Sequence, residues 1–173
     1  MTSSGYLQNM KYWPCINSNY SKHAKRRYVN KNSEWKDYSG LSSNARSYLA
    51  AYFQNNSSYT YSKEKVKAIH LVAEIANLKK NWNDNEADPI PVNILLKAFE
   101  LIEILTVLPD IFPTACGTIQ FEYEKATGEY LELELQEDGI KVFKIDSANV
   151  ENTELISYED FERLKQIVEK FNE

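Results

Sequence analysis

Alternation of apolar and polar side chains across residues 119–145 is the feature that most limits what this chain can fold into. The apolar members of three consecutive runs stand at odd positions, and glutamate, glutamine or lysine stand between them. A period of two places successive side chains on opposite faces, so each run predicts a strand with one buried and one solvated face. The apolar members are Ile119, Phe121, Tyr123, Leu131, Leu133, Leu135, Phe143 and Ile145.

The loops between these runs predict how the strands pair. Buried residues at odd positions face one another only if each loop holds an odd number of residues. Ala126-Thr127-Gly128 and Glu137-Asp138-Gly139 fit this condition, and three-residue hairpin loops commonly end on a left-handed glycine. The prediction is an antiparallel meander. Its facing pairs would be Phe121–Leu133, Tyr123–Leu131, Leu133–Phe143 and Leu131–Ile145.

Helical periodicity precedes the meander. A short helix is expected to begin at Ser42 or Ser43, and a second over 63–79 with Ser62 as its cap. A third helix, over 92–107, is apolar around much of its circumference and is expected at the centre of the core.

The segments after these helices complete the predicted fold. Pro109 and Pro113 are expected to bound a loop before the meander, and residues near Leu155 to add a short edge strand. Ser157 and Asp160 resemble a capping box that opens a last amphipathic helix. The predicted class is α+β: a three- to four-stranded antiparallel meander with helices packed on one face.

Charge divides the chain into two parts. Residues 1–61 carry eight Lys/Arg against two acids, a net of +6, and nine of the twelve tyrosines. Residues 62–173 carry twelve Lys/Arg against twenty-three acids, a net of −11, which sums to the overall −5. The sequence therefore predicts a basic, aromatic arm over residues 1–40 and a single α+β domain over residues 41–173.

The arm is the best candidate for binding. Tyrosine, tryptophan and arginine are favoured anchors of protein interfaces, so a protein partner is expected. The residues assigned to that interface are Tyr12, Trp13, Arg26, Arg27, Tyr28 and Trp35. Two alternatives stay open: the arm folds back onto the acidic sheet face of its own domain, or it binds nucleic acid. Nucleic-acid binding would use Lys22, Lys25, Arg26 and Arg27.

Motifs for other functions are missing from the sequence. There is no phosphate-binding glycine loop, and neither His23 nor His70 belongs to a cluster spaced for metal binding, so no cofactor and no metal site are expected. No apolar run reaches membrane-spanning length, and no secretory signal is read at the start. Cys15 and Cys116 are expected as free thiols in a reducing cytoplasm.

Two carboxylates have an alternative catalytic interpretation. In the predicted register Glu122 faces Glu132, and Glu132 faces Lys144, all on the even-numbered face. In a shielded cleft two facing carboxylates would raise one pKa and support acid–base catalysis by a hydrolase. A solvated face, with Lys144 relieving the repulsion, is the favoured expectation, so no catalytic residue is assigned.

Part of the chain resembles a group of small uncharacterised bacterial proteins. Their shared pattern reads approximately N-W-D-G-Y-G-A-x-P, an apolar helix, a proline-rich loop, G-x-I-x-L-E-W and a strand of L-x-I-E-I type. The matching residues are Asn81, Trp82, Ala87, Pro89, Leu108, Pro109, Pro113, Gly117, Ile119, Phe121, Glu122, Tyr123 and 131–135. Asn83, Asp84 and Glu86 replace the pattern's aspartate and two glycines.

This resemblance implies a bacterial or phage cytoplasmic module of helices and a sheet, and it supplies no catalytic residue. Trp82 is expected to plug the core, with a binding pocket beside Tyr123 as the alternative. The sequence favours a non-enzymatic protein–protein interaction module. An immunity protein, an antitoxin or an accessory factor of a defence or mobile-element system has this profile of a small acidic protein without obvious catalysis.

Overall fold

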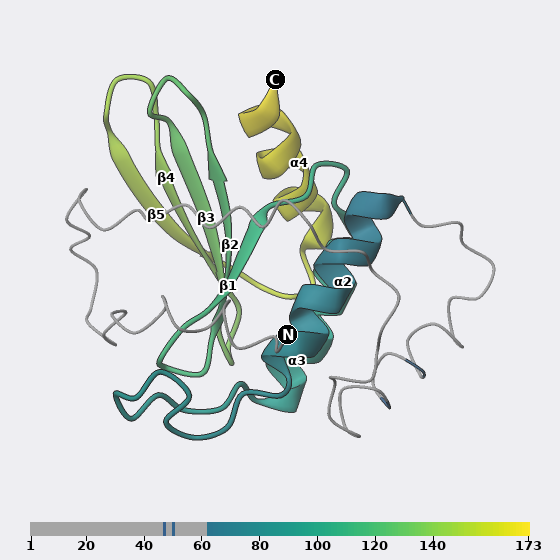
Figure 1. Cartoon of the computed structure of the whole chain (residues 1–173). Helices are drawn as coiled ribbons and strands as arrows, with labels where there is room; N and C mark the ends of the chain where they lie inside the picture. Colours follow the sequence, from purple (N-terminus) through teal and green to yellow (C-terminus); the bar gives the residue numbers. More distant parts are fainter. Residues whose placement is uncertain (1–46, 48–49, 51–61) are drawn as a thin grey trace.

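The structure is a computed structural model, and it describes Ser47, Ala50 and residues 62–173 (Figure 1). Three helices and a five-stranded antiparallel sheet make up this part of the chain, which confirms the α+β class. The elements are α2 (Lys63–Ile75), α3 (Val92–Ile104), β1 (Asp110–Pro113), β2 (Ile119–Glu124), β3 (Tyr130–Leu135), β4 (Ile140–Ile145), β5 (Glu151–Ile156) and α4 (Phe161–Asn172).

The sheet runs in the order β1-β2-β3-β4-β5, and the three helices lie together on one side of it (Figure 1). The core forms between the helices and the sheet face that they cover. Phe121, Leu131 and Leu133 supply its centre from the sheet, and Ile69 and Ile102 supply it from α2 and α3, all without solvent exposure. The predicted helix beginning at Ser42 or Ser43 and the predicted arm fall almost entirely outside the described residues.

α2 and α3 begin where the sequence predicts, at Lys63 and Val92, and end sooner. The Ser62 side chain accepts a hydrogen bond from the amide of Lys65 and caps α2, as expected. α2 ends at Ile75 because a turn follows, in which the amide of Leu78 donates to the carbonyl of Ile75. The predicted capping box at the start of the last helix was wrong: Asp160, not Ser157, is the cap, its carboxylate accepts from the amide of Arg163, and α4 begins at Phe161.

The expected loop between Pro109 and Pro113 contains a strand instead. β1 pairs with β2 so that Ile111 faces Phe121, and Ile111 is buried in the core. With β5 also formed in full, the sheet has five strands rather than three or four. β1 can end on a proline because it is an edge strand of the sheet, where the missing N–H of Pro113 is not needed for pairing.

The hairpin of β2 and β3 matches the predicted register. Phe121 faces Leu133 and Tyr123 faces Leu131, as expected. The loop 126–128 is closed by a hydrogen bond from the amide of Lys125 to the carbonyl of Glu129. Gly128, the third loop residue, has φ +93°, which confirms the predicted left-handed glycine.

The predicted register between β3 and β4 was wrong by one residue. Leu133 faces Val142 rather than Phe143, and Leu131 faces Lys144 rather than Ile145. The connection holds four residues, 136–139, so Val142 enters the core and Phe143 turns to the opposite face. Gly139 is not left-handed; a Cβ there would lie 2.7 Å from the carbonyl oxygen of Ile156, which excludes any side chain.

The loop between α2 and α3 carries the first half of the bacterial pattern. Asp84 and Glu86, which replace its two glycines, have φ values of +57° and +60°, in the region that favours glycine. The Asn83 side-chain oxygen, in place of an aspartate, accepts from the amides of Asn85 and Ala87. The backbone geometry that glycine would favour is therefore present at both substituted positions.

Trp82 lies in the same loop and packs against the core, half-buried, with its indole N–H donating to the carbonyl of Asp88 at 3.0 Å. This supports the expectation of a core plug. Cys116 is disulfide-bonded, so the expectation of a free thiol at this position was wrong. Among the described residues, no helix is long and apolar enough to cross a bilayer.

Candidate functional site

Two surfaces of the sheet are candidates for function: the face turned away from the helices and the outer edge of β5. The first is called the helix-free face below. The strand register places on it Asp110, Phe112, Gln120, Glu122, Glu124, Tyr130, Glu132, Glu134, Lys141, Phe143, Ile145, Glu151, Thr153 and Leu155.

A hydrogen-bonded carboxylate lies at the centre of the helix-free face. Glu132 is 3% exposed, and both of its oxygens have donors: the Tyr130 hydroxyl at 2.9 Å and the Gln120 amide nitrogen at 3.1 Å. Gln120 is itself 3% exposed and Tyr130 9%. This part of the face is therefore a buried polar network, whereas the sequence predicted a solvated face.

The predicted facing of Glu122 and Glu132 is confirmed, but the predicted relief by Lys144 was wrong. Glu132 faces Phe143 across β4, and Lys144 belongs to the opposite face. Burial, the first cause, raises the pKa of the Glu132 carboxyl, and the hydrogen bond from Tyr130 partly opposes that rise. Burial and then the charges of Glu122 and Glu132 raise the pKa of the Tyr130 hydroxyl.

A second hydrogen-bonded group continues from this network toward the β1–β2 turn. Glu134 accepts from the Thr118 hydroxyl at 2.7 Å and from the Gln136 amide at 3.1 Å. The hydroxyls of Thr118 and Thr114 are 2.6 Å apart. The carboxylates at 132 and 134 thus accept bonds from side chains of the same sheet, and this network orders the middle of the helix-free face.

The described residues hold no group of three or more His, Cys, Asp or Glu arranged to bind a metal ion. The catalytic alternative at Glu122 and Glu132 gains a raised pKa at Glu132, and the hydroxyl beside that carboxyl, that of Tyr130, has its own pKa raised by burial. Because both Glu132 oxygens are already engaged by Tyr130 and Gln120, the geometry favours a structural network over acid–base catalysis.

The second surface is the outer edge of β5. In the β4–β5 hairpin the amide of Asp146 donates to the carbonyl of Val150, which makes these two residues a bonded pair. Bonded and non-bonded pairs alternate along an antiparallel ladder. The backbone groups of Glu151, Thr153 and Leu155 therefore point away from β4, toward the open side of the sheet.

The two edges of the sheet differ in how they are protected. β1 has four residues and ends at Pro113, whose backbone lacks the N–H that another strand would need. β5 has six residues without proline or lysine, and its first five residues are exposed. Among the described strands β5 has only β4 as its neighbour, so it presents an unpaired edge.

Apolar and acidic side chains surround this edge. Leu155 is 56% exposed and Val150 51%, the two highest values among the exposed large apolar residues of the described chain. From the β4–β5 turn through the first turn of α4, residues 146–163 carry six acids against one base. That base, Arg163, is paired with Glu154 of β5, which fixes the start of α4 beside the edge.

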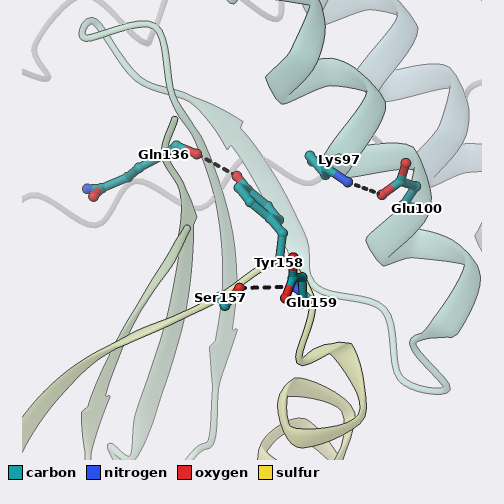
Figure 2. Close-up of polar contacts among 6 residues, drawn as sticks. All are labelled: Lys97, Glu100, Gln136, Ser157, Tyr158 and Glu159. Carbon is teal, nitrogen blue, oxygen red and sulfur yellow. Dashed lines mark hydrogen bonds and ion pairs between the residues drawn. The ribbon is translucent and has the colours of Figure 1, made fainter. Parts of the chain in front are cut away.

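Tyr158 anchors the connection that leads from β5 into α4. Its hydroxyl donates to the carbonyl of Gln136 at 2.6 Å, and Figure 2 shows its ring between that carbonyl and Lys97 of α3. The ammonium of Lys97 lies 5.3 Å from the ring centroid and 2.7 Å from the Glu100 carboxylate. These contacts hold β5 and α4 against the β3–β4 turn, so the exposed edge is built on a fixed element.

The partner-binding residues assigned from the sequence, Tyr12, Trp13, Arg26, Arg27, Tyr28 and Trp35, lie outside the described residues. Their role stays a prediction. The edge of β5 was missed as a site, although one signal was available: a strand rich in Glu, Asn and Thr is typical of an edge. The burial of Glu132 had no such signal, because it depends on long-range packing.

Comparison with protein-family models, with curated protein sequences and with solved structures finds no match at a significant level.

Proposed function

We propose that this protein is a non-enzymatic protein–protein interaction module that binds an extended strand of its partner along the open edge of β5. The observation that carries the proposal is the unpaired, exposed β5 strand, with Leu155 as an apolar anchor. Added strands gain main-chain hydrogen bonds from the edge and specificity from alternate side chains.

Charge selects the kind of partner. The edge region 146–163 carries six acids and one base, and residues 62–173 carry a net −11. A basic strand would be attracted to this edge, whereas a second copy of the same acidic domain would be repelled. The partner that fits best is therefore an extended, basic segment of another protein.

The side chains of β5 define a spacing for that segment. Glu151, Thr153 and Leu155 lie on one face of the sheet at intervals of two residues. A strand that pairs with this edge would place a cation opposite Glu151 and an apolar side chain opposite Leu155, four residues apart. An immunity protein, an antitoxin or an accessory factor that neutralises a basic protein would have this surface.

Replacing Thr153 tests the main-chain part of this binding. The probe is a nine-residue peptide of threonine and valine that carries arginine and leucine four residues apart. Thr153→Pro removes an outward N–H that the peptide strand would bond to, so it should abolish binding. The ladder to β4 does not use this N–H, so the sheet should stay intact. Thr153→Val, which keeps the N–H and the β-branched shape, should bind like the unchanged protein.

The binding is read on titration from NMR shifts of the amides of Glu151 and Leu155, which both variants keep. A peptide with glutamate in place of arginine should bind several-fold more weakly at low salt. Failure of the basic peptide to bind, or equal binding by Thr153→Pro and Thr153→Val, would contradict the proposed function.

Nucleic-acid binding stays a prediction of the sequence alone. Lys22, Lys25, Arg26 and Arg27, on which it depends, lie outside the described residues. The net −11 of residues 62–173 would repel phosphate rather than attract it.

A further inference from the structure

The helix-free face carries an aromatic residue one strand inside the open edge. Phe143 of β4 faces Thr153 of β5 on this face. Phe143 is half-buried and Thr153 is exposed. Leu155, the next residue of β5 on the same face, is 56% exposed. The edge strand therefore has a short side chain at Thr153, between a phenylalanine on the inner side and the open side of the sheet.

The ladder brings Phe143 and Thr153 close together. Asp146 and Val150 form a bonded pair in the β4–β5 hairpin, and bonded pairs alternate with non-bonded ones. Phe143 and Thr153 stand three residue pairs further along, so they are a non-bonded pair, in which side chains approach most closely. From the β3 side, Tyr130 contacts Phe143 with ring centroids 6.2 Å apart in an edge arrangement. The ring is thus held in place from β3, and its β5 neighbour is a short threonine.

A strand added to β5 would place one side chain directly beside Thr153 on this face. That position lies two strand spacings from Phe143, about 10 Å between Cα atoms. Aromatic rings interact at centroid separations of about 4.5–7 Å. An aromatic side chain of the added strand that leans over Thr153 can therefore contact the ring of Phe143, whereas a small side chain at the same position cannot cross the distance.

We infer that Phe143 determines the specificity of the β5 edge, and that the partner segment carries an aromatic side chain opposite Thr153. The inference rests on the proposed binding of a strand along β5. With the cation opposite Glu151 and the apolar side chain opposite Leu155, it defines a partner motif of three alternate residues: basic, aromatic and apolar. All three side chains of the motif lie on the helix-free face.

Three nine-residue peptides test this preference. Each consists of threonine and valine with arginine and leucine four residues apart, and they differ only in the residue midway between those two: threonine, leucine or phenylalanine. Their affinities are measured by NMR titration, from the shifts of the Glu151 and Leu155 amides. The phenylalanine peptide should bind about 5–10-fold more tightly than the threonine peptide, with the leucine peptide in between.

Two variants of the protein locate the aromatic contact. Phe143→Leu keeps an apolar side chain in the sheet and removes the ring, so the phenylalanine and leucine peptides should bind it equally. Phe112→Leu makes the same change at a half-buried position of β1, at the opposite edge of the helix-free face, and should leave the preference for phenylalanine unchanged. In the unchanged protein, the phenylalanine ring of the peptide should show nuclear Overhauser contacts to Phe143, a measurement that needs no variant.

The results separate the role of Phe143 from the proposed function. Equal binding of the three peptides would overturn the role of Phe143 and leave strand binding at β5 intact. A preference for phenylalanine that persists in Phe143→Leu, or the absence of contacts between the two rings, would have the same meaning. Failure of all three peptides to bind would overturn both the role of Phe143 and the proposed function.

Discussion

The hydroxyl of Tyr130 donates to the carboxylate of Glu132 at 2.9 Å, between two side chains on the same face of β3. Both groups are buried, and burial raises the pKa of each above its ordinary value. The pair therefore links the protonation of one carboxyl to the folding of the sheet.

Replacing Glu132 by glutamine should flatten the pH dependence of stability. The folded pKa of Glu132 lies above its ordinary value of 4.5, so the folded state holds this proton more tightly than the unfolded state. Its contribution to the free energy of unfolding is present at low pH and is lost as pH rises through the folded pKa. The loss amounts to about 1.4 kcal/mol for each unit of pKa shift.

Urea unfolding between acid and neutral pH measures this effect in the unchanged protein and in Glu132→Gln. Burial also raises the pKa of Glu74, so Glu74→Gln serves as a control of the same sign at another site. Parallel stability curves for the unchanged protein and Glu132→Gln would show that the Glu132 carboxyl is not buried in solution.

Replacing Glu86 by glycine should stabilise the protein. Glu86 is exposed and has φ +60°, where a side chain costs about 1 kcal/mol and glycine costs less. Allowing for the greater freedom of glycine in the unfolded chain, we expect a gain of about 0.5 kcal/mol in the free energy of unfolding. Glu86→Ala keeps the Cβ and should show no such gain in denaturant unfolding. A glycine variant that is less stable than the alanine variant would contradict the positive φ at this position.

Two isoleucines at opposite ends of β4 test the strand register. Ile140 is fully buried on the helix-covered face, and Ile145 is half-buried on the helix-free face. Ile140→Ala should lower the free energy of unfolding by about 3 kcal/mol, and Ile145→Ala by about 1 kcal/mol. The register predicted from the sequence would place Ile145 in the core, so a larger loss for Ile145→Ala would reject the register found in the structure.

Thiol titration tests the oxidation state of Cys116. The disulfide predicts that the purified protein, kept without reductant and unfolded in denaturant, reacts with no thiol reagent. After reduction the two cysteines of the sequence should both react. Two reactive thiols before reduction would contradict the disulfide at Cys116.

The sequence predicted those elements whose signals are local. Ser62 caps α2 because a serine oxygen can reach the amide three residues later, and Gly128 is left-handed because its loop has three residues. The alternation in β2 and β3 is unambiguous, so the facing of Phe121 and Leu133 was predictable from it.

The register of β4 was not predictable in this way, because the strand has apolar residues at both even and odd positions. Ile140 and Val142 compete with Phe143 and Ile145 for the core, and a four-residue loop decides in favour of the first pair. The close approach of Gly139 to the carbonyl of Ile156 belongs to the same loop, and it depends on a strand that is distant in the sequence.

The candidate site depended on similar long-range information. The exposure of Leu155 follows from the strand order of the whole sheet, and the burial of Glu132 follows from Tyr130 and Gln120 on two neighbouring positions of the face. Neither is contained in the residue types of one strand.

Hydrogen exchange along β5, measured by NMR on the protein without a partner, tests the open edge most directly. The amides of Asn152, Glu154 and Ile156 point toward β4 and should exchange slowly, whereas those of Glu151, Thr153 and Leu155 point outward and should exchange quickly. This alternation is the predicted result. Slow exchange at all six positions would show that the edge is already covered, and would contradict a binding function for β5.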